Sequence, residues 1–184
     1  MKTLRAGPVS LLFEEAYGSV RRLSVAGHEA VRRIYVAVRD REWNTLPAQV
    51  WNVQVRADPD SFEVSYLARC AKGDIDFAWK AVITGDAKGT VSFRMSGQAR
   101  SDFYRNRAGF CVLHPRACAG LPASVESADG GLRRGNFPRY IYPNPPFTNF
   151  NKIWYAPAPG LKLRVTLEGD AFEMEDQRNW SDAS

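Results

Sequence analysis

The sequence contains few of the residues from which disulfide frameworks and metal sites are built. Its 184 residues include three cysteines (Cys70, Cys111 and Cys118) and two histidines (His28 and His114). An odd cysteine count without a CxxC pair argues against a disulfide framework and against a zinc knuckle. Two histidines are too few for a His-rich metal site. We therefore expect neither a bound metal nor a cofactor.

Long apolar runs and clusters of like charge are also scarce. No window approaches 18 consecutive apolar residues, and the apolar run near the N-terminus is too short for a secretory signal. The 25 basic and 20 acidic residues are spread in ones and twos. A surface that follows nucleic-acid phosphates usually shows basic clustering. We expect a cytoplasmic protein whose partners include neither a membrane nor a nucleic acid.

An alternation of apolar and polar side chains with a period of two dominates the chain. Residues 77–83 and 91–95 both alternate in this way, and the turn sequence GDAKG between them predicts an antiparallel hairpin. Residues 161–167 repeat the pattern. Further strands are expected at about 8–15, 19–25, 29–38, 50–57, 61–70, 108–113 and 122–127. This spacing predicts an all-β fold, an antiparallel β-sandwich of the super-sandwich kind, in a single domain over residues 1–184.

One stretch departs from the alternation. Residues 135–160 hold six of the eleven prolines together with many aromatic residues. Proline cannot donate to a central ladder of hydrogen bonds, so we expect a long loop rich in proline and aromatic residues that crosses or covers a sheet. Its rings either cap the core or line a pocket for a sugar-like ligand.

Residues 175–180 combine acids, amides, a guanidinium and an indole in one short segment. The residues are Glu175, Asp176, Gln177, Arg178, Asn179 and Trp180. Arg178 has the fork geometry that grips a carboxylate, and an indole such as Trp180 stacks on the apolar face of a sugar ring. The same groups would equally serve to tie the sandwich to a following segment. The sequence alone leaves both interpretations open.

A second candidate lies around the strand expected at 108–113. Arg107 precedes it and His114 follows it, and His114 is the one plausible titrating base in the second half of the chain. A lone histidine at a strand end more often serves as a structural hydrogen-bonding group. Cys111 lies within the apolar run GFCVL, where burial raises a thiol pKa, and is a poor nucleophile candidate.

Five segments together resemble the N-terminal part of the D-apionate lactonases. They are LRAGPVSLLFE, IYVAVRDREWNT, GDIDFAWKAVITG, RNRAGFCVLHP and EGDAFEMEDQRNWSDAS. The resemblance implies a hydrolase of branched-sugar catabolism that opens D-apionolactone. It also implies that residues 1–184 are the N-terminal fragment of a longer enzyme, with a C-terminal catalytic domain as partner.

A lactonase must activate a water, stabilise the developing oxyanion and hold the substrate hydroxyls. By residue type, the candidate bases are Glu175, Asp176 and His114, and the candidate substrate contacts are Arg178, Asn179, Trp180 and Arg107. Two alternatives stay open, a non-catalytic carbohydrate-binding or accessory module and a mutarotase-like sugar epimerase. The epimerase is the weaker of the two, because that chemistry relies on histidine.

Overall fold

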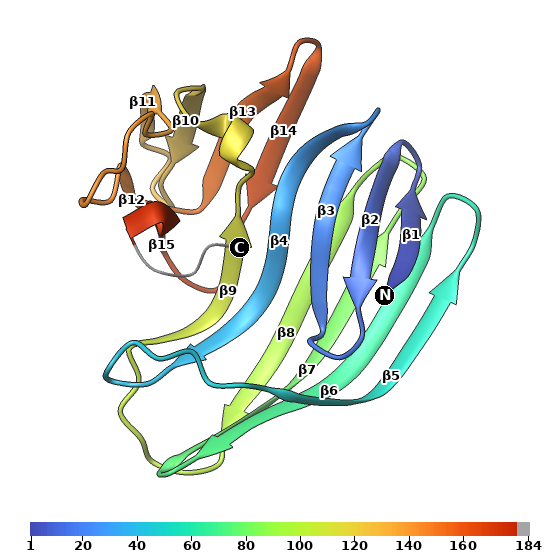
Figure 1. The fold of residues 1–184 in the computed structure, drawn as a ribbon, viewed down its shortest axis with the longest axis vertical. Coiled ribbons are helices and arrows are strands. Elements are labelled where there is room, and N and C mark those ends of the chain that lie inside the picture. Colours follow the sequence, from blue (N-terminus) through green and yellow to red (C-terminus); the bar gives the residue numbers. More distant parts are fainter. Residues whose placement is uncertain (180–184) are drawn as a thin grey trace. The chain divides into compact units, whose positions relative to one another are not determined.

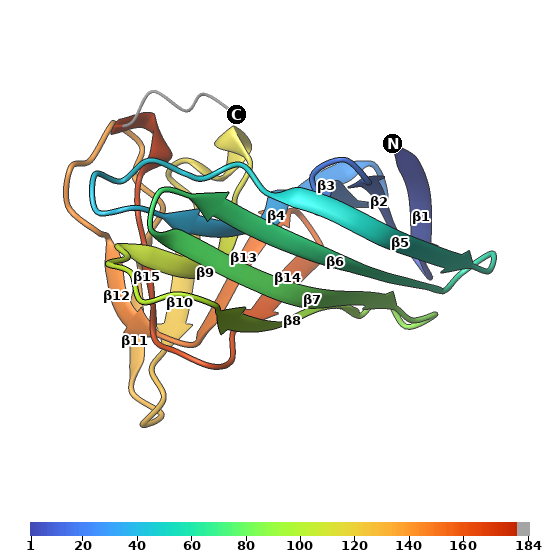
Figure 2. The ribbon, with the colours of Figure 1, turned by 90° about the horizontal axis from the view of Figure 1, so that it is seen from below.

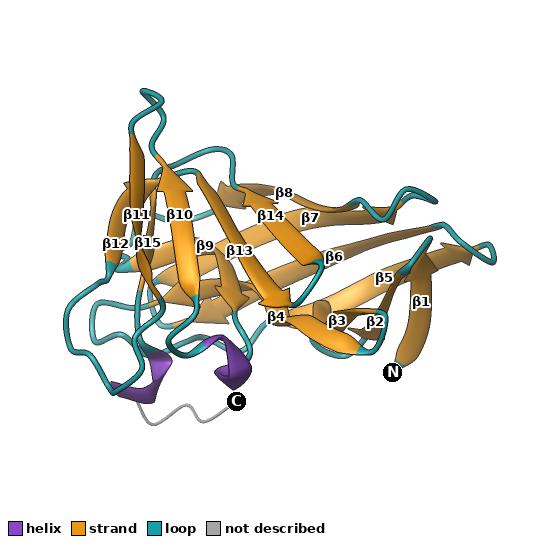
Figure 3. Cartoon of the chain, turned by 90° about the horizontal axis from the view of Figure 1, so that it is seen from above, coloured by secondary structure: helices purple, strands orange, loops and turns teal. Residues whose placement is uncertain are grey.

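The computed structural model describes residues 1–179, whose regular secondary structure is almost entirely strand (Figure 3). The helices in this described part are two single 3₁₀ turns, η1 (Arg116–Cys118) and η2 (Gln177–Asn179). No helix within residues 1–179 is long and apolar enough to cross a membrane. All the paired strands are antiparallel, which confirms the predicted all-β class.

The chain divides into two compact units, Met1–His114 and Pro115–Ser184. This division into units does not test the prediction of a single domain over residues 1–184, which stays a prediction. Each unit has its own sheets and its own buried residues, so we describe them separately.

Unit 1 contains two antiparallel sheets (Figure 1). The first has the order β1-β2-β3-β4-β9, with bounds Lys2–Ala6, Val9–Glu14, Ser19–Val25, His28–Arg39 and Arg107–Leu113. The second has the order β5-β6-β7-β8, with bounds Gln49–Ala57, Phe62–Lys72, Ile75–Gly85 and Val91–Ala99. The hairpin expected from the GDAKG turn is the β7–β8 pair, with Gly85 opposite Val91.

The two sheets of unit 1 pack face to face, as Figure 2 shows for the layer β5–β8 against β1–β4. The Phe13 ring of β2 lies 6.3 Å from the Tyr66 ring of β6. At another point, Phe93 of β8 and Phe110 of β9 meet edge to face at 5.0 Å. Phe13 and Tyr66 each belong to a run of alternate buried residues in their strand, the periodicity that a sandwich requires. The predicted β-sandwich is therefore present in unit 1.

The hydroxyl of Tyr66 links the two sheets through a turn. It donates a hydrogen bond of 2.6 Å to the carbonyl of Gly18, which lies just before β3. Desolvation raises the pKa of this phenol, as expected for a group inside the sandwich. We expect Tyr66→Phe to lower the free energy of unfolding by about 1 kcal/mol, since the Gly18 carbonyl loses its donor. Urea unfolding measures this, and Tyr104→Phe at an exposed site is the control.

Unit 2 holds a four-stranded sheet of order β11-β10-β13-β14 and a two-stranded sheet of β12 and β15. The bounds, in chain order from β10 to β15, are Pro122–Glu126, Leu132–Asn136, Phe147–Phe150, Lys152–Ala158, Leu161–Thr166 and Phe172–Met174. Its core gathers nine buried residues: Cys118, Ala123, Val125, Phe137, Phe147, Phe150, Ile153, Tyr155 and Met174.

The long loop expected over residues 135–160 is shorter than predicted. Only residues 137–146 form a loop, and the strands β12 and β13 occupy most of the remainder. Proline is tolerated in β13 because Pro157 lies at a register shift between Tyr155 and Ala158. Buried rings of Phe137, Phe147 and Tyr155 confirm that this stretch contributes its aromatic side chains to a core.

Candidate functional site

The segment that follows β15 is positioned by the core of unit 2. Within β15, Met174 is buried and Glu173 is exposed, which is the alternation expected of a half-buried strand. Met174 pairs with Phe147 of β12, and Phe172 pairs with Phe150. Because these apolar side chains fix the strand, the residues after Met174 are held beside the loop at 137–146.

Both oxygens of the Asp176 carboxylate accept hydrogen bonds from neighbouring groups of the chain. Its Oδ1 accepts from the backbone N–H of Arg178 at 3.2 Å and from Nε of Arg178 at 2.8 Å. Its Oδ2 accepts from Nη2 of Arg178 at 2.7 Å and from the backbone N–H of Tyr142 at 3.0 Å. An ionised carboxylate offers about four acceptor positions, and these bonds take all of them. The side chain is only 5% exposed.

Arg178 joins the same carboxylate to three successive backbone carbonyls. Nη1 donates to Arg139 O at 3.0 Å, and Nη2 donates to Pro138 O at 2.9 Å and to Tyr140 O at 3.0 Å. Together with the two bonds to Asp176, these occupy most of the guanidinium donors. The planar fork, a candidate substrate contact by residue type, binds the chain itself in this structure.

Asn179 completes the arrangement, because its side-chain amide donates to Tyr142 O at 2.6 Å. We call Asp176, Arg178 and Asn179 the clamp. The loop at 137–146 needs such donors from outside, since its four prolines carry no N–H while every residue carries a carbonyl. The clamp therefore satisfies loop carbonyls that the loop cannot satisfy itself.

The ionic character of the clamp lowers the pKa of Asp176. The Arg178 side chain is the main cause, and the backbone N–H groups of Tyr142 and Arg178 add to it, while desolvation opposes it. The same pairing raises the pKa of Arg178. A carboxylate whose ionised form is stabilised in this way is a weak proton acceptor. The geometry thus disfavours Asp176 as a general base.

Stability should depend on pH through this carboxylate. A pKa that is lower in the folded state than in the unfolded state stabilises the fold above the unfolded pKa of about 3.9, and this stabilisation disappears as the pH falls through the folded pKa. We expect the stability difference between the chain and Asp176→Asn to shrink from about pH 5 downward. Urea unfolding at stepped pH measures it, and other carboxylates with lowered pKa values cancel in the difference. A difference that is constant across this pH range would contradict the assignment.

The remaining predicted site residues are placed elsewhere or are not described. Glu175 is half-buried between β15 and η2, and Trp180 lies outside the described residues.

His114 is the last residue of unit 1. It keeps some exposed area, but desolvation of its ring lowers the pKa to about 4, so the imidazole is neutral at pH 7 and a weak base. Arg107 lies over the Trp43 ring, 5.2 Å from its centroid. The clamp belongs to unit 2 and Arg107 belongs to unit 1.

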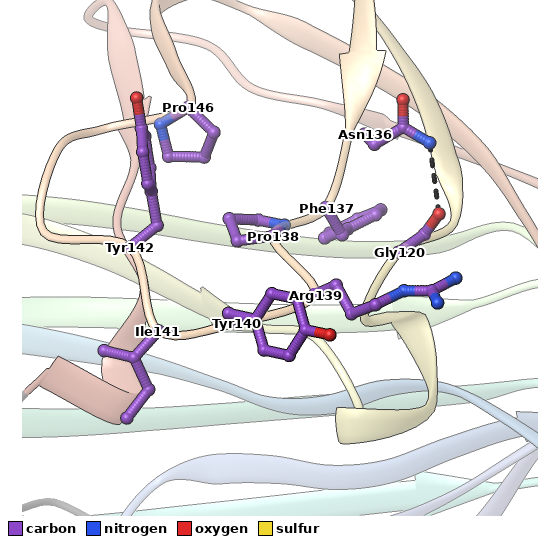
Figure 4. Close-up of a pocket in the computed structure, with 9 residues that line it drawn as sticks. All are labelled: Gly120, Asn136, Phe137, Pro138, Arg139, Tyr140, Ile141, Tyr142 and Pro146. Carbon is purple, nitrogen blue, oxygen red and sulfur yellow. Dashed lines mark hydrogen bonds between the residues drawn. The ribbon is translucent and has the colours of Figure 1, made fainter.

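Next to the clamped loop is a pocket of about 500 Å³ that is open to solvent (Figure 4). Residues 136–142 line it together with Gly120 and Pro146. A hydrogen bond of 3.1 Å from the Asn136 side-chain amide to Gly120 O holds one end. Sequence reasoning proposed either core capping or a pocket for this stretch, and the structure contains both: Phe137 is buried, whereas Tyr140 is exposed.

Sequence reasoning missed a buried charge in unit 1. Glu14 is 8% exposed and accepts a hydrogen bond of 2.7 Å from the Ser19 hydroxyl. Its carboxylate also lies 3.4 Å from Arg21 Nη1 and 3.6 Å from Arg33 Nη2. The guanidinium of Arg33 in turn lies 4.9 Å from the centroid of the Tyr35 ring. Only the pairing register of β2, β3 and β4 brings these residues together, so no local motif predicts the cluster.

No metal centre is indicated in the part of the chain that the structure describes, because no three of its His, Cys, Asp or Glu residues are grouped to hold an ion. The described fold and the clamp define an all-β region of sandwich type with a loop braced from its own chain. The chain belongs to the family described as "D-apionate lactonase, N-terminal domain", whose model matches residues 1–184.

A curated relative is the D-apionate lactonase of Brucella anthropi. It is 39% identical over 183 residues, which are 98% of this chain and 30% of the relative. The chain therefore spans less than a third of the length of that protein. No solved structure matches the chain. These findings confirm the family resemblance seen in the five sequence segments.

Proposed function

We propose that this chain is the N-terminal β-sandwich portion of a hydrolase that opens a sugar-acid lactone of the D-apionolactone kind. The observation that carries the proposal is the 39% identity to a D-apionate lactonase across 98% of the chain. In the reaction, water adds to the lactone carbonyl and the ring ester C–O bond breaks. The products are a carboxylate, a free hydroxyl and one proton. A small sugar lactone is thus the substrate of the longer protein.

The geometry favours a supporting role for this portion. Asp176 has no acceptor position left for a water proton, and Arg178 is bound to backbone carbonyls rather than aimed at open space. We propose that the water-activating group lies outside residues 1–179. A cytoplasmic setting is part of the same proposal, and it agrees with the small number of cysteines, three in 184 residues.

A proton-release assay tests the proposal. The 184-residue chain is compared with a hybrid in which it replaces the matched region of the Brucella anthropi relative. A pH indicator follows D-apionolactone, and boiled hybrid gives the background. We expect the hybrid to release protons and the 184-residue chain alone to stay at background. Turnover by the chain alone would place the catalytic groups within it, and an inert, folded hybrid would count against the lactonase assignment.

A further inference from the structure

The loop that the clamp holds presents three consecutive large side chains to solvent. Tyr140 is 82% exposed, Ile141 60% and Tyr142 46%. We call these three residues the tip. Exposed apolar residues are ordinary when they are scattered, but three in succession beside an open pocket form a patch.

The backbone beneath the tip is held far more firmly than an exposed loop usually is. The clamp bonds the carbonyls of Pro138, Arg139 and Tyr140, and both the N–H and the carbonyl of Tyr142. In Figure 4 the loop runs from Pro138 to Pro146 along the pocket, with Tyr140, Ile141 and Tyr142 in its middle. A surface whose backbone is fixed before binding loses little conformational entropy when a partner covers it.

We infer that the tip and the adjoining pocket are the docking surface for the part of a D-apionate lactonase that lies beyond the matched region. This inference rests on the proposed function. The matched region is 30% of the relative. The rest of that protein is therefore more than twice as long as the matched region and needs a surface to pack against. Tyrosine anchors are enriched at the centres of protein interfaces, and the pocket beside them accepts a partner side chain.

The position of the clamp supports this occupant over a second copy of the chain. Asn179, the last residue that the structure describes, bonds directly to Tyr142, and the matched region extends only five residues further along the chain. A segment joined at that point reaches the tip at a high effective concentration, which a separate molecule does not have. The same residues that anchor the loop therefore position the partner.

Hydroxyl-radical footprinting tests the docking surface. The hybrid described above and the 184-residue chain are oxidised in parallel, and tyrosine oxidation is read by mass spectrometry. We expect the reactivity of Tyr140 and Tyr142 to fall at least about threefold in the hybrid, because an interface excludes solvent from its central residues. Tyr17 and Tyr104, which are 65% and 79% exposed in unit 1, are the matched controls and should change little. Unchanged reactivity of Tyr140 would overturn the inference.

A variant supplies an independent readout. Tyr140→Ser with Ile141→Ser should leave the Tm of the 184-residue chain unchanged, since both side chains are exposed, but should lower the Tm of the hybrid. Tyr104→Ser is the control in both proteins. The lactone assay separates the two proposals. Lactone opening with an unprotected Tyr140 overturns the docking surface alone, whereas a protected Tyr140 without lactone opening overturns the lactonase assignment alone.

Discussion

Replacing Arg178 with alanine should lower the free energy of unfolding of unit 2 by about 2 kcal/mol. The change removes two bonds to the Asp176 carboxylate and three bonds to backbone carbonyls of the loop. It also leaves the carboxylate of Asp176, only 5% exposed, with a charge that no side-chain cation neutralises. The expected loss is smaller than for a fully buried pair, because Arg178 is 34% exposed and solvent screens its charge.

Comparison variants separate the geometry of the fork from its charge. Arg178→Lys keeps the charge but offers one ammonium in place of five N–H donors, so we expect it to recover less than half of the loss. Arg164→Ala removes an exposed arginine from β14 of the same unit and should cost no more than about 0.5 kcal/mol. Urea unfolding measures all three. An Arg178→Ala variant as stable as Arg164→Ala would show that the clamp contributes nothing.

Gly85→Ala should destabilise unit 1 by about 3 kcal/mol, at the upper end for overpacking. A Cβ at this position would lie 2.2 Å from Cε1 of Phe62 and 2.7 Å from Cβ of Ala6, and both neighbours are buried in the sandwich core. Phe62 is the direct pairing partner of Gly85, so its ring fills the space that a side chain would occupy. The φ of Gly85 lies outside the left-handed region, so the cost is steric rather than conformational.

A smaller partner should relieve that clash. Phe62→Leu in the Gly85→Ala background removes the ring atoms nearest the new methyl group, and we expect the double variant to be more stable than Gly85→Ala alone. Phe62→Leu by itself should be destabilising, because it leaves space in a close-packed core. Thermal unfolding of the three variants forms a double-mutant cycle. Additive effects in that cycle would contradict the proposed contact.

The strands that are easiest to predict are those whose side chains alternate between a less exposed and a more exposed face. β6 alternates between buried and more exposed residues from Phe62 to Cys70, and β7 does so from Trp79 to Gly85, a pattern that is visible in sequence. β11 was missed because its residues are almost all exposed, which leaves no apolar period to detect. β1 was missed because it is only five residues long and begins with exposed residues. β12 and β13 were hidden by the surrounding prolines, whose tolerance depends on a local register shift.

The clamp illustrates what residue types reveal and what they omit. The composition of residues 175–180 predicts either ligand binding or a tie within the chain, and residue types alone do not choose between the two. The acceptors of Arg178 and Asn179 are the backbone carbonyls of residues 138, 139, 140 and 142, and a carbonyl carries no signature of residue type. One physical clue was present in the sequence: a loop with four prolines has more carbonyls than N–H groups and needs donors from elsewhere.

The central claim is that the 176–179 segment braces a loop and performs no chemistry, and Asp176→Asn in the hybrid lactonase tests it most directly. Asparagine keeps the shape of the side chain and retains an acceptor for Tyr142 N–H. If Asp176 is structural, kcat for D-apionolactone below the melting temperature should stay within about threefold of the parent hybrid, since no proton transfer depends on it. A general base contributes about 10²–10⁴ to the rate, so a fall in kcat of that size in a folded variant would contradict the account.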